Sequence, residues 1–143
     1  MIEDIKNLIQ KENKQMTEKE DWYELEFEYL GYTAKAVRYS EYSHLCGYIK
    51  KDFELSDEMY EALNDNSHGG ITYDNEDCIG FDCNHARDFN LARYYQFKEI
   101  GLGVDFETHL QHETYRDLNY VIQTLKNMIS AIADEHIIRN EDE

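Results

Sequence analysis

The sequence of 143 residues contains no proline, only seven glycines and only three cysteines. Without proline, every turn has to be formed by Gly, Asn, Asp or Ser. The odd number of cysteines, Cys46, Cys78 and Cys83, argues against a disulfide framework and predicts that each thiol is buried, binds a metal or acts as a nucleophile. No stretch approaches the roughly 18 continuous apolar residues of a membrane span. The charged residues 1–13 lack the apolar run of a signal peptide, so we expect a soluble protein of the cytoplasm.

Basic residues are also scarce. Fourteen Lys and Arg stand against 31 Asp and Glu, which gives a formal net charge of −17. This balance excludes the clustered basic surface with which proteins ordinarily contact nucleic-acid phosphates. Hydrophobic residues nevertheless make up 41% of the chain and aromatic residues 13%. That content is sufficient for a folded core and too high for an acidic disordered tail.

Hydrophobic periodicity predicts an α+β fold. Strict alternation over 22–29 and a returning segment at 32–39 predict a hairpin of strands, with Glu24, Glu26 and Glu28 on the polar face of the first. Further strands are expected at 46–49, 71–73 and 78–83, the last two joined by a four-residue loop. Helices are expected at 2–14, 57–63 and 91–97, and a sustained apolar stripe predicts one long helix over 113–137.

These elements predict an antiparallel β-sheet, with hairpins near 22–39 and 70–83, packed against the long C-terminal helix. The length indicates one domain. We expect a helical arm at 1–20, the α+β domain at 21–138 and an acidic tail at 139–143.

Three ordered motifs occupy the middle of the chain: CGY at 46–48, HGGIT at 68–72 and GFDCNHARD at 80–88. Together they resemble an uncharacterised family of small proteins that is common in bacteriophages and other mobile elements. The resemblance covers residues 44–88, less than a third of the chain. It implies an accessory protein of such an element and brings no settled activity with it.

The motif residues allow three chemical interpretations. Two thiolates and two imidazoles would form a closed zinc site, although the chain lacks the usual C-x₂-C anchor. A cysteine would act as a nucleophile, with a histidine as base and an aspartate orienting it. In the third interpretation, which we favour, the thiols are buried, Asp82 accepts backbone N–H groups and the histidines support a loop cluster. The residues concerned are Cys46, His68, Asp82, Cys83, His85 and Asp88.

The negative charge is unevenly distributed. Between Lys51 and Arg87 there is no Lys or Arg, whereas ten acids occur. A net charge of about 2–8 suffices for the solubility of a small domain, and the surplus costs stability through self-repulsion. One explanation is solubility, and the other is a negative surface that enters a partner's basic groove, as a nucleic-acid mimic does. That surface would consist of Asp52, Glu54, Asp57, Glu58, Glu61, Asp65, Asp74, Glu76 and Asp77, with Glu24, Glu26 and Glu28.

Mobile elements encode small acidic inhibitors of host nucleases, such as antirestriction and anti-CRISPR proteins. By this analogy, the resemblance implies a non-enzymatic protein that binds and inhibits a host defence protein with a basic nucleic-acid-binding surface. It would need no cofactor and would contact neither nucleic acid nor membrane. The alternative is a small enzyme, or a metal- or ligand-binding module, built on Cys46, His68, Cys83 and His85. The sequence identifies neither the partner nor the oligomeric state.

Overall fold

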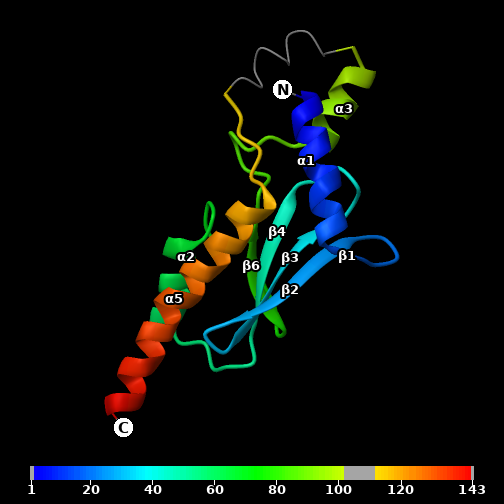
Figure 1. Ribbon diagram of the computed structural model, residues 1–143. Helices are drawn as coiled ribbons and strands as arrows, with labels where there is room; N and C mark the ends of the chain where they lie inside the picture. The colour runs from blue at the N-terminus through cyan, green and yellow to red at the C-terminus, as the bar shows by residue number, and fades with distance from the viewer. Residues whose placement is uncertain (1, 102–111, 143) are drawn as a thin grey trace.

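The computed structural model describes residues 2–101 and 112–142, with only the backbone described at 134–142 (Figure 1). The helices are α1 (Ile2–Gln15), α2 (Asp57–Asn66), α3 (Leu91–Glu99) and α5 (Leu118–Asp142). The strands are β1 (Thr17–Glu18), β2 (Tyr23–Tyr29), β3 (Tyr32–Arg38), β4 (Leu45–Lys50), β5 (Tyr73–Asp74) and β6 (Cys78–Asp82). The α+β class predicted from periodicity is confirmed.

The strands form one antiparallel sheet in the order β1-β2-β3-β4-β6-β5. Leu30 and Gly31 join β2 to β3, and both have positive φ angles, of 51° and 84°. Positive φ at both central residues is typical of a two-residue hairpin whose twist matches its strands. The two predicted hairpins therefore belong to the same sheet, because β4 pairs with both β3 and β6.

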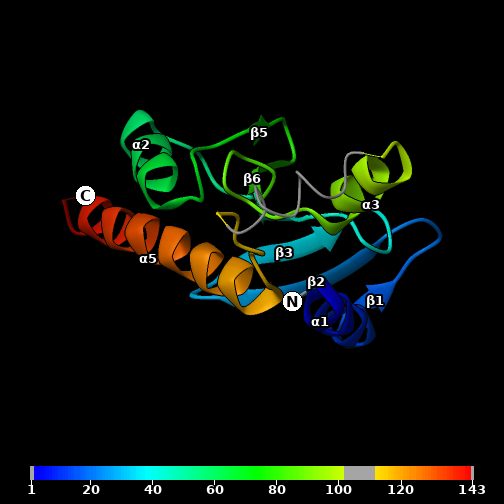
Figure 2. The same ribbon diagram turned by 90° about the horizontal axis from the view of Figure 1, so that it is seen from above.

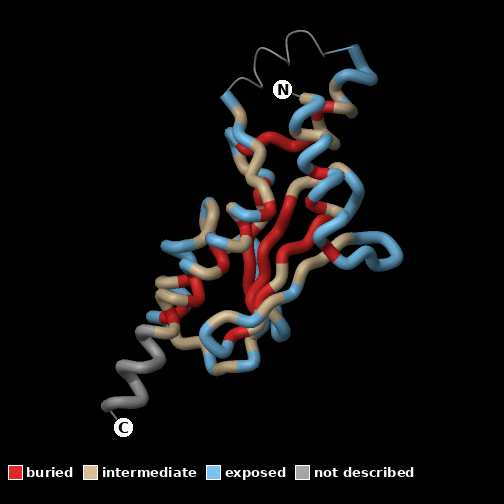
Figure 3. Tube along the Cα trace, viewed as in Figure 1, coloured by how far each residue is buried: buried red, intermediate tan, exposed pale blue. Residues whose placement is uncertain are grey.

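Helix α5 covers one face of this sheet and lies beside α2 (Figure 2). Its apolar stripe, which includes Val121, Leu125 and Met128, is fully buried. The stripe packs on alternate residues of the strands, among them Ile49 and Phe81. Buried residues are accordingly concentrated in the central strands and on the inner sides of α2 and α5 (Figure 3).

A second, smaller core lies at one end of the sheet, where α1 packs against α3 (Figure 1). It contains Ile9, Phe89 and Tyr94. The helical arm expected at 1–20 is thus in contact with the rest of the molecule. Glu12 anchors it, because this buried carboxylate accepts a hydrogen bond of 2.9 Å from the fully buried guanidinium of Arg38.

The long helix begins at Leu118, five residues later than the periodicity predicts. Asp117 Oδ1 accepts a hydrogen bond of 2.8 Å from the backbone N–H of Tyr120, and such a cap starts a helix. The preceding residues are held in an extended path, since Thr114 bridges to Asp88. At the other end, the tail expected at 139–143 continues α5 as far as Asp142, and Glu143 lies outside the described residues.

Two smaller differences concern the sheet. Thr17 and Glu18, where no strand is predicted, form β1 and pair with β2. The loop between β5 and β6 has three residues, 75–77, rather than four. Asn75 determines this turn, because its side-chain Oδ1 accepts hydrogen bonds from the backbone N–H groups of Asp77 and Cys78.

Candidate functional site

The second and third motifs meet around a hydrogen-bonded pair formed by His68 and Asp88. His68 Nε2 lies 2.8 Å from Asp88 Oδ2, and His68 Nδ1 lies 2.7 Å from the hydroxyl of Tyr120 on α5. The side chain of His68 is 11% exposed and that of Asp88 is 2% exposed. His68 and Asp88, twenty residues apart in sequence, thereby join the second and third motifs to the first turn of α5.

Asp88 receives further hydrogen bonds from two directions. The backbone N–H of His85 donates to Oδ2 at 3.0 Å, and Arg116 Nε donates to Oδ1 at 3.0 Å. Burial alone would raise the pKa of this carboxyl. The hydrogen bonds from His68, from the His85 backbone and from Arg116 outweigh burial and hold the pKa of Asp88 below its ordinary value. Asp88 is therefore a buried anion whose charge is satisfied on all sides.

Glycines allow the motifs to approach each other closely. A Cβ atom at Gly69 would lie 2.7 Å from the ring of His85, and one at Gly47 would lie 2.7 Å from the ring of Phe81. At Gly80 a Cβ atom would lie 2.1 Å from the carbonyl oxygen of Gly47. Each glycine thus makes room for a residue of another motif or for its backbone.

Cys46 and Cys83 are buried in hydrophobic clusters, whereas Cys78 is half-buried. Cys46 packs with Val37 and Tyr48, whereas Cys83 belongs to the main core. Burial raises the pKa of Cys46 to about 11, and it also raises the pKa of Cys83 well above its ordinary value. Both groups are thus thiols at neutral pH, a form that is a poor nucleophile and a poor metal ligand. Among the described residues, no group of three or more His, Cys, Asp and Glu side chains could hold a metal ion.

Asp82 is the last residue of β6, and His85 lies in the turn between β6 and Asp88. Asp82 Oδ1 accepts a hydrogen bond of 3.0 Å from the backbone N–H of Asn84. The third interpretation of the motif residues expects a contact of this kind. His85 Nε2 lies 3.7 Å from Asp82 Oδ1 and has no hydrogen-bond partner among the described residues. The described side-chain contacts of Asp82 and His85 are therefore with residues of the 82–88 segment and of the adjoining second motif.

Sequence reasoning missed two members of the cluster, Arg116 and Tyr120. Arg116 precedes α5, and Tyr120 lies in its first turn. The apolar periodicity of this region draws attention only to residues that pack in the core. Arg116 also lies over the ring of Tyr120, 5.1 Å from its centroid. Their signal in the sequence is weak, because one residue is charged and the other aromatic, and nothing in the local pattern couples them to His68.

The nine predicted acids between Asp52 and Asp77 are all exposed. They lie in the segment after β4, on α2 and around the turn between β5 and β6. The structure divides the predicted surface, because α2 lies with α5 on one side of the sheet. Glu24, Glu26 and Glu28 alternate with the residues of β2 that contact α5, so they belong to the other, open face.

Helix α2 has Asp57 and Glu58 in its first turn, where the helix dipole favours acids, but its other acids are unfavourably placed. Asp57, Glu61 and Asp65 follow each other at i, i+4 and i+8, so they form one exposed stripe. Like charges at this spacing destabilise a helix, and Asp65 lies in the last turn, where the helix dipole disfavours negative charge. The last turn contains no basic residue. The salt bridges between described side chains do not include these three acids.

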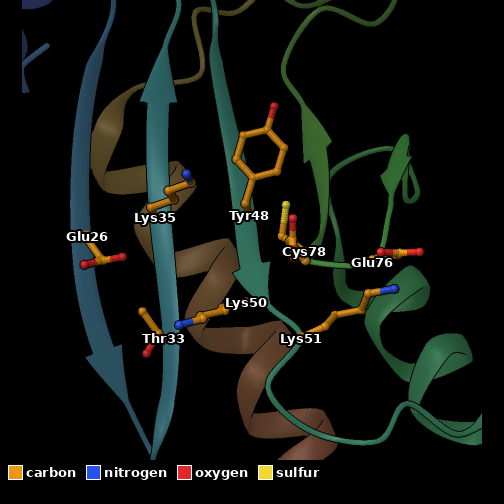
Figure 4. Close-up of a pocket in the computed structure, with 9 residues that line it drawn as sticks. Glu26, Thr33, Lys35, Tyr48, Lys50, Lys51, Glu76 and Cys78 are labelled. Carbon is orange, nitrogen blue, oxygen red and sulfur yellow. The ribbon is translucent and has the colours of Figure 1, made fainter.

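The open face of the sheet contains a pocket of about 350 Å³ that the sequence did not indicate (Figure 4). Lys35 and Lys50 lie in its middle, with Thr33 and the ring of Tyr48. Its other lining residues are Glu26, Lys51, Glu76, Asp77 and Cys78. The pocket therefore gathers three of the fourteen basic residues of an acidic chain.

Comparisons with protein-family models, with curated proteins and with solved structures give no match for this chain. Among the described residues, no helix is both long and apolar enough to cross a membrane. The function of the chain is therefore inferred from its own residues and their geometry.

Proposed function

We propose that this chain is an acidic inhibitory protein whose helix α2 enters a basic, nucleic-acid-binding groove of a host defence protein. The stripe of Asp57, Glu61 and Asp65 forms the centre of the contact, and Asp52 and Glu54 extend it. The partner is a nuclease or another nucleic-acid-binding effector of the host cytoplasm. Binding blocks the groove, and the inhibitor performs no chemistry.

The observation that carries this proposal is the unfavourable placement of the acids on α2. A helix selected only for stability would place its acids in the first turn and bases in the last. Here the acids continue into the last turn, where they cost stability. Residues that violate a local rule without compensation are concentrated at functional sites. Solubility alone would not require this arrangement, because exposed positions elsewhere serve it equally well.

The burial of the thiols also favours binding over catalysis. Cys46 and Cys83 are in their neutral forms, and the carboxylate of Asp88 is already occupied by three hydrogen-bond donors. The motif cluster then serves to hold the sheet, the 84–88 loop and α5 together, which gives α2 a rigid support. Complementary charge accelerates association with a basic partner and makes binding sensitive to salt.

The proposal is tested with DNA-cleavage assays on a panel of purified restriction endonucleases and RNA-guided nucleases. We expect inhibition of at least one enzyme in 50 mM salt that weakens markedly in 500 mM salt. The variant D57N/E61Q/D65N should inhibit about tenfold less well, since three exposed charge contacts of about 0.5 kcal/mol each amount to roughly that factor.

A matched control removes three exposed acids from the other end of the molecule, in the variant E18Q/E20Q/D21N. It changes the net charge by the same amount and should inhibit like the wild type. The proposal is contradicted if no enzyme of the panel is inhibited, or if the two variants inhibit equally.

A further inference from the structure

The pocket on the open sheet face lies on the opposite side of the sheet from α5, and the proposed function makes no use of it (Figure 4). Strand periodicity explains its composition. Thr33 and Lys35 are two residues apart on β3, and Tyr48 and Lys50 are two apart on β4, so all four project from the same face. Lys35 is directly opposite Tyr48 in the register of the two strands.

Among the described residues, the two central lysines form no salt bridge with the acids beside them. Glu26 is the register partner of Lys35, yet the salt bridges of the described residues do not include this pair. Lys35 instead directs its ammonium group over the ring of Tyr48, 6.0 Å from the centroid. The hydrogen bonds and salt bridges between described residues do not include the ammonium group of Lys50. Lys51 differs, because it is bound to Asp74 at 2.6 Å.

Lys51 fixes one wall of the pocket, the turn between β5 and β6. Lys51 donates its backbone N–H to the carbonyl of Asp77 at 2.8 Å and its ammonium group to Asp74. These contacts tie the turn between β5 and β6 to the end of β4. Glu76 therefore lies on one flank of the pocket and Glu26 on the other, with Lys35 and Lys50 between them (Figure 4).

We propose that this pocket binds a small phosphorylated ligand of nucleotide size. Lys35, Lys50 and the hydroxyl of Thr33 bind the phosphate, since ammonium and hydroxyl groups are its usual donors. The flanking carboxylates repel a second anionic group and accept hydrogen bonds from hydroxyl or amino groups of the ligand. A volume of about 350 Å³ is at the lower end of the range for small-molecule sites.

The test is a calorimetric titration of the full chain with adenosine 5′-monophosphate, in parallel with an NMR titration that follows the backbone amides of β3 and β4. We expect saturable binding with amide shifts confined to these strands and the β5–β6 turn. Adenosine, which has the same ring and sugar without the phosphate, should bind at least tenfold more weakly.

The variant K35Q/K50Q should lose at least tenfold in affinity for the nucleotide, and K50Q alone should lose part of it. K50Q should fold like the wild type, because Lys50 is exposed at the end of its strand. It therefore tests the binding of the nucleotide even if the double variant does not fold. The control K11Q/K98Q removes the same charge from α1 and α3 and should bind like the wild type. The proposal is overturned if the nucleotide shows no saturable binding up to 10 mM, if adenosine binds equally well, or if K35Q/K50Q binds like the control.

Discussion

Asp88 is the residue at which most contacts of the motif cluster converge. Its carboxylate accepts from His68, from the backbone of His85 and from Arg116, and its own carbonyl oxygen accepts from Arg93 at 3.0 Å. One buried anion thus connects a loop before β5, a loop after β6 and the approach to α5. Such networks are stable only when each member is satisfied.

The substitution Asp88→Asn should lower the free energy of unfolding at pH 7 by about 2–4 kcal/mol, because it replaces a charged acceptor with an amide and leaves buried donors without partners. The folded-state pKa of Asp88 lies below its unfolded value, so its stabilising contribution is present above that value and is lost as the pH falls through the folded pKa. The difference between the wild type and D88N, measured by urea unfolding, should therefore shrink below about pH 4. A difference that stays constant from pH 7 to pH 3 would contradict this assignment.

The glycines of the motifs give a second prediction at the residue scale. A Cβ atom at Gly80 would meet the backbone of Gly47, which has no freedom to move aside, whereas at Gly47 it would meet the ring edge of Phe81. Gly47→Ala should cost about 1–3 kcal/mol, and Gly80→Ala should cost more than G47A does. Equilibrium unfolding of both variants decides the order, and a milder effect for G80A would show that β4 and β6 are less closely apposed than described.

At the scale of elements, one substitution in α2 should raise the stability of the protein and weaken its binding to the target enzyme. Asp65→Lys would place a positive charge in the last turn and at i+4 from Glu61, both of which stabilise a helix. We expect the free energy of unfolding to rise by about 0.3–1 kcal/mol, while inhibition of the target enzyme weakens. Thermal unfolding and the cleavage assay are measured on the same preparation. A variant that is less stable than the wild type would contradict the account of α2.

Helix α1 is attached to the sheet through a buried ion pair. Glu12 accepts from Arg38 with Oε1, and its Oε2 accepts from the backbone N–H of Leu118 at 2.6 Å, so it also satisfies the start of α5. Removing one partner leaves a buried charge alone.

Glu12→Ala should accordingly cost about 3–5 kcal/mol, as should Arg38→Met. In the double variant neither charge remains buried without its partner, so its cost should be smaller than the sum of the single costs. A double-mutant cycle from urea unfolding measures this coupling, and strict additivity would show that the pair contributes nothing as a pair.

At the scale of the whole molecule, the net charge of −17 predicts how stability responds to salt. The Debye length falls from about 30 Å at 0.01 M to about 10 Å at 0.1 M, so salt screens the mutual repulsion of the acids. The melting temperature should rise over this range, and it should rise less for D57N/E61Q/D65N, whose charge is −14. Binding to a basic partner should weaken over the same range, and a melting temperature that falls with salt would contradict this prediction.

The elements of the fold were predictable where local pattern and tertiary environment agree. The alternation of β2 and β3 and the apolar stripe of α5 reflect one face packed on the core, and the structure confirms these elements. The predicted start of α5 was wrong by five residues. Tyr115 continues the apolar spacing of the helix, but it lies before the helix and its hydroxyl is hydrogen-bonded to Glu12. β1 was missed because two residues carry no periodicity, and only pairing with β2 defines them.

The candidate site was predictable only in part. The motifs singled out His68, His85 and Asp88 together with Cys46 and Cys83. The structure joins only the two histidines and Asp88 in a polar cluster and places the two cysteines in hydrophobic clusters. The motifs did not indicate that Tyr120 would complete the cluster, because it lies 52 residues from its partner. The sequence did not indicate the lysine pocket for a similar reason. Lys35 and Lys50 are unremarkable in sequence and meet only because β3 and β4 are paired.

The sequence by itself determined the class of the fold, the excess of acid and the separation of polar from apolar faces, because these follow from composition and from spacing along one element. Only the tertiary structure decided which faces the charges occupy. It placed the acids of α2 on the helical side and the lysines of the pocket on the open face, and it left Cys46 and Cys83 in apolar surroundings. The physical reason is that register and packing join residues far apart in the chain, and no local pattern records such contacts.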